Sequence, residues 1–151
     1  MRHCLSLGAA LCLAASSSTW APLPSDPSWT AEGPVDQAYL GEEVASAGDL
    51  DGDGYSDIVA TGTGTAWVYR GGPAGLDIDP VQIPVPTASV GSAGDFNGDG
   101  YGDLVIGGSD RISLHFGGPS GISTSPAGTY SGPLGSYLGS SLAGRGDIND
   151  D

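Results

Sequence analysis

Two stretches of the chain place oxygen-bearing side chains at every second position, the spacing with which a short loop can surround a metal ion. The first stretch runs from Asp49 to Asp57 and the second from Asp95 to Asp103. In both, positions 1, 3, 5 and 9 carry Asp or Asn, and position 6 is glycine. Hard cations such as Ca²⁺ take about six to eight oxygen ligands, and like charges this dense repel one another unless a cation neutralises them. The spacing therefore predicts one calcium ion in each loop.

Each predicted site follows the same scheme. Glycine at position 6 tolerates a positive φ, which turns the carbonyl of position 7 toward the ion. In the first loop the predicted ligands are the side chains of Asp49, Asp51, Asp53 and Asp57 and the carbonyl of Tyr55. In the second loop they are the side chains of Asp95, Asn97, Asp99 and Asp103 and the carbonyl of Tyr101. Since ligand charge raises affinity, we expect the first loop, with its additional aspartate, to bind calcium more tightly.

An EF-hand and a metal-free turn both fit these loops less well. An EF-hand shares the first half of the pattern but needs a glutamate at position 12 and flanking helices. Position 12 is Ala60 in the first loop and Ile106 in the second, and both lie in runs with a strand pattern. A plain Asp/Gly turn without metal could produce one copy, but two complete copies in the same register favour a metal. No cysteine or nearby histidine supplies the ligands that transition metals prefer.

A third copy begins close to the end of the sequence. Its predicted ligands are Asp147, Asn149 and Asp151, and the copy stops at position 5. The same stretch contains the adhesion tripeptide Arg145-Gly146-Asp147. Because Asp147 is position 1 of the third loop, we expect it to bind calcium rather than a receptor.

The loops belong to a larger repeat in which the local pattern is all β. The loops recur about every 50 residues, a period found in propellers and solenoids, and no helical periodicity follows the N-terminal segment. The first repeat has predicted strands at Val44–Ala47, Asp57–Thr61, Ala66–Tyr69 and Val81–Ile83, and the second has matching strands at Asp103–Gly107 and Ile112–Phe116. In this last strand Ile112, Leu114 and Phe116 share one face, and Ser113 and His115 the other. We expect Trp67 and Tyr69 to pack between blades.

Four short strands per repeat are typical of a β-propeller blade. The sequence therefore predicts an all-β fold with two four-stranded blades and the start of a third, as part of a larger propeller. A blade buries its faces only against neighbours, so we expect further blades from a longer chain or from a neighbouring chain.

These features resemble the FG-GAP repeats of the N-terminal β-propeller of integrin α subunits and of many secreted bacterial proteins. Tyr39-Leu40-Gly41 and Tyr137-Leu138-Gly139 stand where the Phe-Gly element is expected. Gly71-Gly72-Pro73 and Phe116-Gly117-Gly118-Pro119 correspond to the Gly-Ala-Pro element. The second repeat departs from the pattern at Thr87, where glycine is expected, so its first corner is expected to differ. The resemblance implies structural calcium hairpins between two strands of each blade, with the ligands named above.

The N-terminal residues have the pattern of a secretory signal peptide. A short basic start precedes about a dozen small and apolar residues, too few for a transmembrane helix. We predict a signal peptide over residues 1–18, a Pro/Ser-rich linker or entry strand over 19–38, blades over 39–86 and 87–136, and a partial third blade over 137–151. Cys4 and Cys12 both lie in the signal segment, so the mature chain is expected to have no disulfide.

The composition narrows the classes of function. With 18 acidic residues against 4 basic ones, the net charge is −14, which argues against nucleic-acid binding. The 27 glycines and 11 prolines argue against a helix bundle. No catalytic constellation is recognisable. We therefore expect a non-enzymatic, secreted or cell-surface protein that binds calcium and recognises extracellular protein or carbohydrate. The alternative is the N-terminal scaffold of a longer secreted enzyme, such as a polysaccharide lyase or hydrolase.

Overall fold

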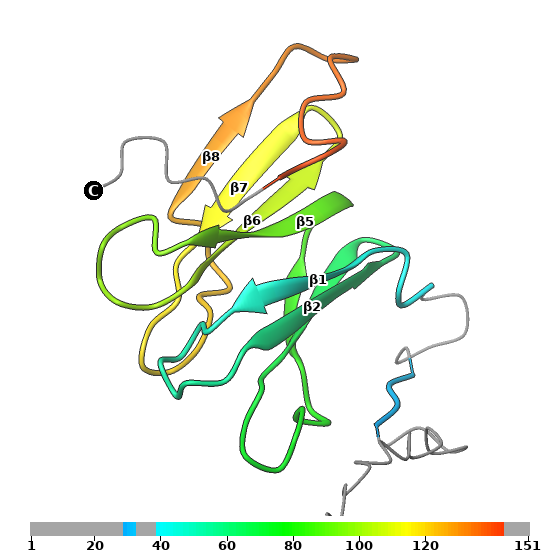
Figure 1. The fold of residues 1–151 in the computed structure, drawn as a ribbon. Helices are drawn as coiled ribbons and strands as arrows, with labels where there is room; N and C mark the ends of the chain where they lie inside the picture. The colour runs from blue at the N-terminus through cyan, green and yellow to red at the C-terminus, as the bar shows by residue number, and fades with distance from the viewer. Residues whose placement is uncertain (1–28, 33–38, 144–151) are drawn as a thin grey trace, which may run out of the picture.

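The computed structural model describes residues 29–32 and 39–143, in which the chain forms two four-stranded antiparallel sheets (Figure 1). The predicted signal peptide, the partial third loop with Asp147, Asn149 and Asp151, and the tripeptide at 145–147 lie outside these residues. The first sheet contains β1 (Val44–Gly48), β2 (Asp57–Gly62), β3 (Thr65–Tyr69) and β4 (Val81–Pro84), in that order. The second contains β5 (Thr87–Gly94), β6 (Asp103–Gly108), β7 (Arg111–His115) and β8 (Gly128–Ser131).

This architecture confirms the predicted all-β fold, and each sheet has the strand number and order of a propeller blade. The acidic loops connect the first two strands of each sheet, β1 to β2 and β5 to β6. The second repeat departs from the repeat pattern at Thr87, where glycine is expected, and the structure differs at the same place. A turn with Gly41 at φ 96° precedes β1, whereas β5 already pairs with β6 at Thr87 and is the longest of the described strands.

Two-residue hairpins join the second and third strands of both sheets. Their second residues, Gly64 and Asp110, have φ of 71° and 61°, in the left-handed region that glycine and aspartate adopt more readily than most residues. Asp110 also holds a more distant segment, because its carboxylate accepts hydrogen bonds from the backbone N–H groups of Gly135 and Tyr137, each at 2.7 Å. These backbone hydrogen bonds lower the pKa of the Asp110 carboxyl below its usual value. The hairpin thereby fixes the segment that follows the second sheet.

The hydrophobic core lies where the two sheets pack on each other. One face of the first sheet packs against the second sheet, with β1 and β2 next to β5 (Figure 1). The side chains at this contact are at most 2% exposed: Val59, Ala66, Val68 and Ile83 from the first sheet, and Val90, Leu104 and Ile106 from the second. Glu43 adds a polar link, since its Oε2 accepts a hydrogen bond of 3.1 Å from the Val90 N–H. Burial of both faces here explains why β2 and β6 are almost continuously apolar.

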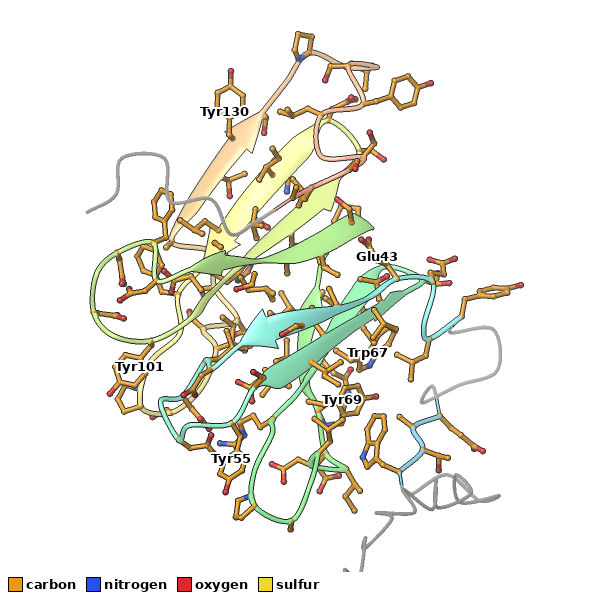
Figure 2. All side chains as sticks on the ribbon, viewed as in Figure 1. Glu43, Tyr55, Trp67, Tyr69, Tyr101 and Tyr130 are labelled. Carbon is orange, nitrogen blue, oxygen red and sulfur yellow. The ribbon has the colours of Figure 1, made fainter. Side chains whose placement is uncertain are left out.

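The opposite face of the first sheet is covered by the N-terminal segment. Trp67 and Tyr69 lie on this face and pack against Trp29 and Leu40 (Figure 2). The rings of Trp29 and Tyr69 meet edge to face, with centroids 5.0 Å apart. The prediction that Trp67 and Tyr69 pack between blades is therefore wrong for the two described sheets. The physical reason is the register, because the side chains that point toward the second sheet are those of the alternate residues Ala66 and Val68.

His115 is the counterpart of Tyr69 in the second sheet and is only 1% exposed. It pairs with Leu104 and points toward the first sheet, so the buried face of β7 is the one that carries Ser113 and His115. The Nδ1 atom lies 3.0 Å from the Ser123 carbonyl oxygen and the Nε2 atom 3.2 Å from Ser113 Oγ. Burial lowers the pKa of the His115 imidazole, which favours the neutral ring.

This burial predicts a loss of stability in mild acid. The unfolded chain protonates His115 near pH 6.5, whereas the folded chain does so only at a lower pH, so stability is lost as the pH falls from about 6.5 toward the folded pKa. The histidine contributes up to about 1.4 kcal/mol of loss at pH 5.5. Urea unfolding at pH 7.5 and pH 5.5 measures this difference. In His115→Gln the difference should shrink by that amount, and an unchanged pH dependence would show that His115 titrates normally.

Candidate metal centre

The carboxylate of Asp49 organises the first acidic loop from within. Its Oδ1 accepts hydrogen bonds from the N–H groups of Gly52 (2.7 Å) and Asp53 (3.1 Å), and its Oδ2 accepts one from Gly54 (2.9 Å). Gly52 and Gly54 have φ of 77° and 89°, so both need the freedom of glycine. The positive φ predicted for position 6, Gly54, is thereby confirmed. The result is a tight turn that gathers the alternate side chains on one side.

The second loop repeats this construction. Asp95 accepts hydrogen bonds from the N–H groups of Gly98 (2.8 Å), Asp99 (3.0 Å) and Gly100 (2.8 Å). Gly100, at position 6, has a φ of 90°. The Asn97 side-chain amide donates a hydrogen bond of 2.8 Å to Asp99, a bond that the aspartate at the same position of the first loop could not donate. Two loops about 50 residues apart therefore fold alike because the same residue types stand at the same positions.

The last acid of each loop anchors the loop to its sheet. Asp57 is fully buried, and its carboxylate accepts hydrogen bonds from the N–H groups of Leu50 (2.9 Å) and Gly71 (2.7 Å). Asp103, also fully buried, binds Phe96 N–H (2.8 Å) and Gly117 N–H (3.0 Å) in the same way. Burial raises the pKa of Asp57, although these two hydrogen bonds oppose the rise. The position 9 acids therefore tie the start of each loop to the corner after the third strand.

The first loop brings three of its predicted ligands together. Carboxylate oxygens of Asp49, Asp51 and Asp53 lie within 4.8 Å of one another, close enough to share one cation. Asp57 is not in this group. The carboxylate, amide and carbonyl oxygens that the two loops offer suit a hard cation such as Ca²⁺. The residues present thus fit the predicted calcium ion, with Asp49, Asp51 and Asp53 as the ligands that the structure already gathers.

Comparison with known protein families identifies the repeat. Residues 49–106 match the family model of the FG-GAP-like repeat. The chain contains an FG-GAP-like repeat segment. No curated protein showed a significant match to the chain. The matched segment begins at position 1 of the first acidic loop and ends within β6, so it contains both loops. In the part of the chain that the structure describes, no helix is long and apolar enough to cross a membrane.

The first FG-GAP loop is also braced by the second sheet, a feature that the sequence pattern did not predict. The carbonyl of Asp49 accepts a hydrogen bond of 2.7 Å from Gly102 N–H, and the carbonyl of Leu50 accepts one of 2.9 Å from Gly118 N–H. The Tyr101 ring lies against Gly52. A Cβ added to Gly102 would lie only 2.8 Å from the Asp49 oxygen, so this close approach requires glycine. The sequence gives one sign of this contact, the recurring Gly-Gly-Pro element, which contains Gly118.

The loop of the second sheet lacks this bracing within the described residues. Phe96 occupies the position of Leu50, yet Phe96 is 68% exposed and Leu50 fully buried. Tyr55 and Tyr101, the residues at position 7 of the two loops, are labelled in Figure 2. The two FG-GAP loops thus share their internal geometry and differ in their surroundings.

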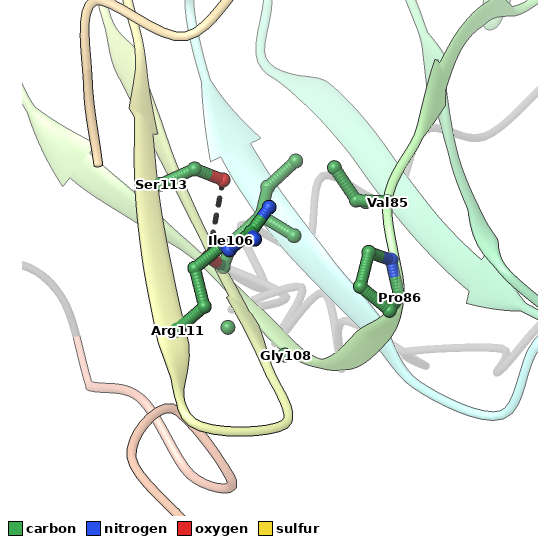
Figure 3. Close-up of a pocket in the computed structure, with 7 residues that line it drawn as sticks. Val85, Pro86, Ile106, Gly108, Arg111 and Ser113 are labelled. Atoms are coloured by element: carbon green, nitrogen blue, oxygen red, sulfur yellow. Dashed lines mark hydrogen bonds between the residues drawn. The ribbon is translucent and has the colours of Figure 1, made fainter. Parts of the chain in front are cut away.

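The seam between the sheets contains a small cavity. Val85 and Pro86, which connect the sheets, face Ile106 and Arg111 across it (Figure 3). Ser113 Oγ donates a hydrogen bond of 3.4 Å to the Ile106 carbonyl at its wall. The cavity volume is about 10 Å³, enough for about one water molecule. It has no room for a substrate, so the acidic loops remain the stronger candidate site.

Proposed function

We propose that this FG-GAP segment is a non-catalytic scaffold whose two acidic loops bind structural calcium ions. The observation that carries the proposal is the group of Asp49, Asp51 and Asp53 oxygens within 4.8 Å of one another, in a loop whose backbone already holds them in place. The second loop has the same internal hydrogen bonds, with Asn97 at the position of Asp51. Bound calcium neutralises the clustered carboxylates, so each ion should stabilise the turn between the first two strands of its sheet.

We propose further that the protein works outside the cell, in recognition of protein or carbohydrate. The signal-peptide pattern of residues 1–18 supports export, and FG-GAP repeats are typical of extracellular proteins. The net charge of −14 favours cations and basic partners over nucleic acid. N-terminal sequencing of the protein recovered outside the cell tests this location. Export predicts that residues 1–18 have been removed, and a protein that stays inside the cell with residues 1–18 intact would contradict the proposal.

Calcium is expected to raise the stability of the full chain. At free calcium about 100-fold above the dissociation constant, each site adds about 2.7 kcal/mol to the free energy of unfolding. The measurement is thermal unfolding in calcium, in magnesium and in chelator, together with calorimetric titration of calcium. Magnesium should stabilise less, because it demands a smaller octahedral shell.

A double variant tests whether the loops are the sites. Asp53→Ala combined with Asp99→Ala removes one ligand from each loop and should abolish most of the calcium-dependent shift. The matched control, Glu42→Gln with Asp79→Asn, removes two exposed charges outside the loops and should keep the shift. An unfolding midpoint that is the same in calcium and in chelator would refute the proposal.

A further inference from the structure

Arg70 lies beside the first acidic loop and connects it to another part of the first sheet. It follows directly after β3, and its guanidinium reaches two acids. Nη1 lies 3.7 Å from Asp51 Oδ2, and Nη2 lies 3.6 Å from Asp77 Oδ2. The side chain of Asp51 is 14% exposed, whereas those of Arg70 and Asp77 are 44% and 55% exposed. Of the two carboxylates, Asp51 is the better shielded from water, so its attraction to Arg70 is screened less.

This arginine is specific to the first loop. Tyr69 pairs with Ile58 in the first sheet, and His115 pairs with Leu104 at the same place in the second. The residue after His115 is Phe116, so an uncharged ring stands where the first sheet has Arg70. Among the described residues, the ion pairs are the two that Arg70 makes, and neither involves the second loop.

We propose that Arg70 is a built-in counter-ion that lowers the calcium affinity of the first loop. The inference rests on the proposed calcium binding of that loop. Asp51 is one of the three acids that the structure gathers there, and Arg70 holds the same carboxylate. Calcium binding therefore places a double positive charge next to a single one, and the ion has to displace or share the guanidinium.

Asp77 gives the guanidinium a second partner. A cleft of about 290 Å³ separates the acidic loop from the corner of residues 71–75, and Asp51, Arg70 and Asp77 line it. The space allows the half-exposed arginine to turn toward Asp77 when calcium occupies the loop. Asp77 should therefore favour calcium binding, although it lies outside the predicted ligand set.

The arrangement changes the expected order of affinities. Counting ligand charges alone, the first loop is tighter because it has Asp51 where the second has Asn97. One arginine offsets one aspartate, so the two loops of the unmodified protein should bind calcium within about threefold of each other. The effect of Arg70 on calcium affinity thus cancels the effect of the additional aspartate, Asp51.

The experiment is calorimetric titration of calcium in the full chain carrying Asp99→Ala, which disables the second loop and isolates the first. Arg70→Met should tighten calcium binding by about threefold to tenfold, the range expected for one partly screened charge. The matched control is Arg111→Met, which removes the same charge from the far end of the β6–β7 hairpin and should change affinity by less than about twofold. Asp77→Asn should weaken binding by about twofold to fivefold, with Asp79→Asn as its control.

The combination of variants separates the possible failures. In Arg70→Met, the additional change Asp77→Asn should have little effect, because Asp77 acts through the arginine. Calcium binding that Arg70→Met leaves unchanged overturns the inference and leaves the proposed function in place. If the unmodified chain binds no calcium, the proposed function fails and this inference fails with it. A tightening equally large in Arg111→Met would assign the effect to net charge and overturn the role of Arg70.

Discussion

Asp57→Ala is expected to lower the free energy of unfolding by about 2–4 kcal/mol, even in chelator. The fully buried carboxylate accepts hydrogen bonds from Leu50 N–H and Gly71 N–H, and truncation leaves both donors buried without an acceptor. Each hydrogen bond to a charged acceptor contributes about 1.5–3 kcal/mol. Part of this gain is offset by the lost hydration that also raises the pKa of Asp57. Urea unfolding followed by tryptophan fluorescence measures the loss.

Two further variants show what the carboxylate does. Asp57→Asn keeps the shape and one acceptor but turns an amide donor toward a backbone N–H, so its loss should be smaller than that of Asp57→Ala. Asp79→Ala removes an exposed acid and should stay within about 0.5 kcal/mol of the unmodified chain. If Asp57→Ala costs nothing in chelator, the carboxylate has no structural role apart from any bound ion.

Leu50→Ala is expected to cost about 3–5 kcal/mol, whereas Phe96→Ala should cost less than about 0.5 kcal/mol. The two residues occupy position 2 of their loops. Leu50 is fully buried in the core between the sheets, and its loss leaves a cavity. Phe96 is 68% exposed, and its removal exposes little new surface. The same urea measurement, made with both variants, gives the comparison.

This pair tests the difference in surroundings between the loops. Identical loops with identical surroundings would give equal losses at position 2. A loss at Phe96 as large as that at Leu50 would mean that Phe96 is covered in solution, and would contradict the exposed position seen here. A small loss at Leu50 would contradict the packing of the two sheets.

The strands with strong local patterns could be predicted from the sequence. β2 and β3 were expected at nearly the residues where they occur, because apolar and β-branched residues stand between glycine turns. β8 was not predicted, and its four residues, Gly128–Ser131, are all exposed. A short polar strand carries no hydrophobic pattern, so only its pairing with β7 reveals it.

The sequence could not predict in the same way which neighbouring element each strand face packs against. Alternation shows that Trp67 and Tyr69 share a face, but it does not show which neighbour covers that face. That depends on how the sheets stack and on Trp29, a residue almost 40 positions earlier in the chain. β7 shows the opposite case. Its more polar face, which carries His115, is the one that packs against the first sheet.

The acidic loops show the same division between local and long-range information. The grouping of Asp49, Asp51 and Asp53 could be predicted because it depends on a single turn and its glycines. The bonds from Gly102 and Gly118 to the carbonyls of the first loop could not, since a backbone carbonyl leaves no mark in the sequence. Arg70 was equally invisible as a neighbour of Asp51, because the loop and β3 meet only in the folded sheet.

The bonds from Gly102 and Gly118 also set an order of events on the ribosome. The first acidic loop is translated about 70 residues before Gly118, the donor that completes its bracing. At about 5–20 residues per second this interval is about 3–14 s. Throughout it the residues that form the internal hydrogen bonds of the loop are already present, but the second sheet is not. The nascent first loop is thus less completely braced than the finished one, and the second repeat completes the bracing as the chain emerges.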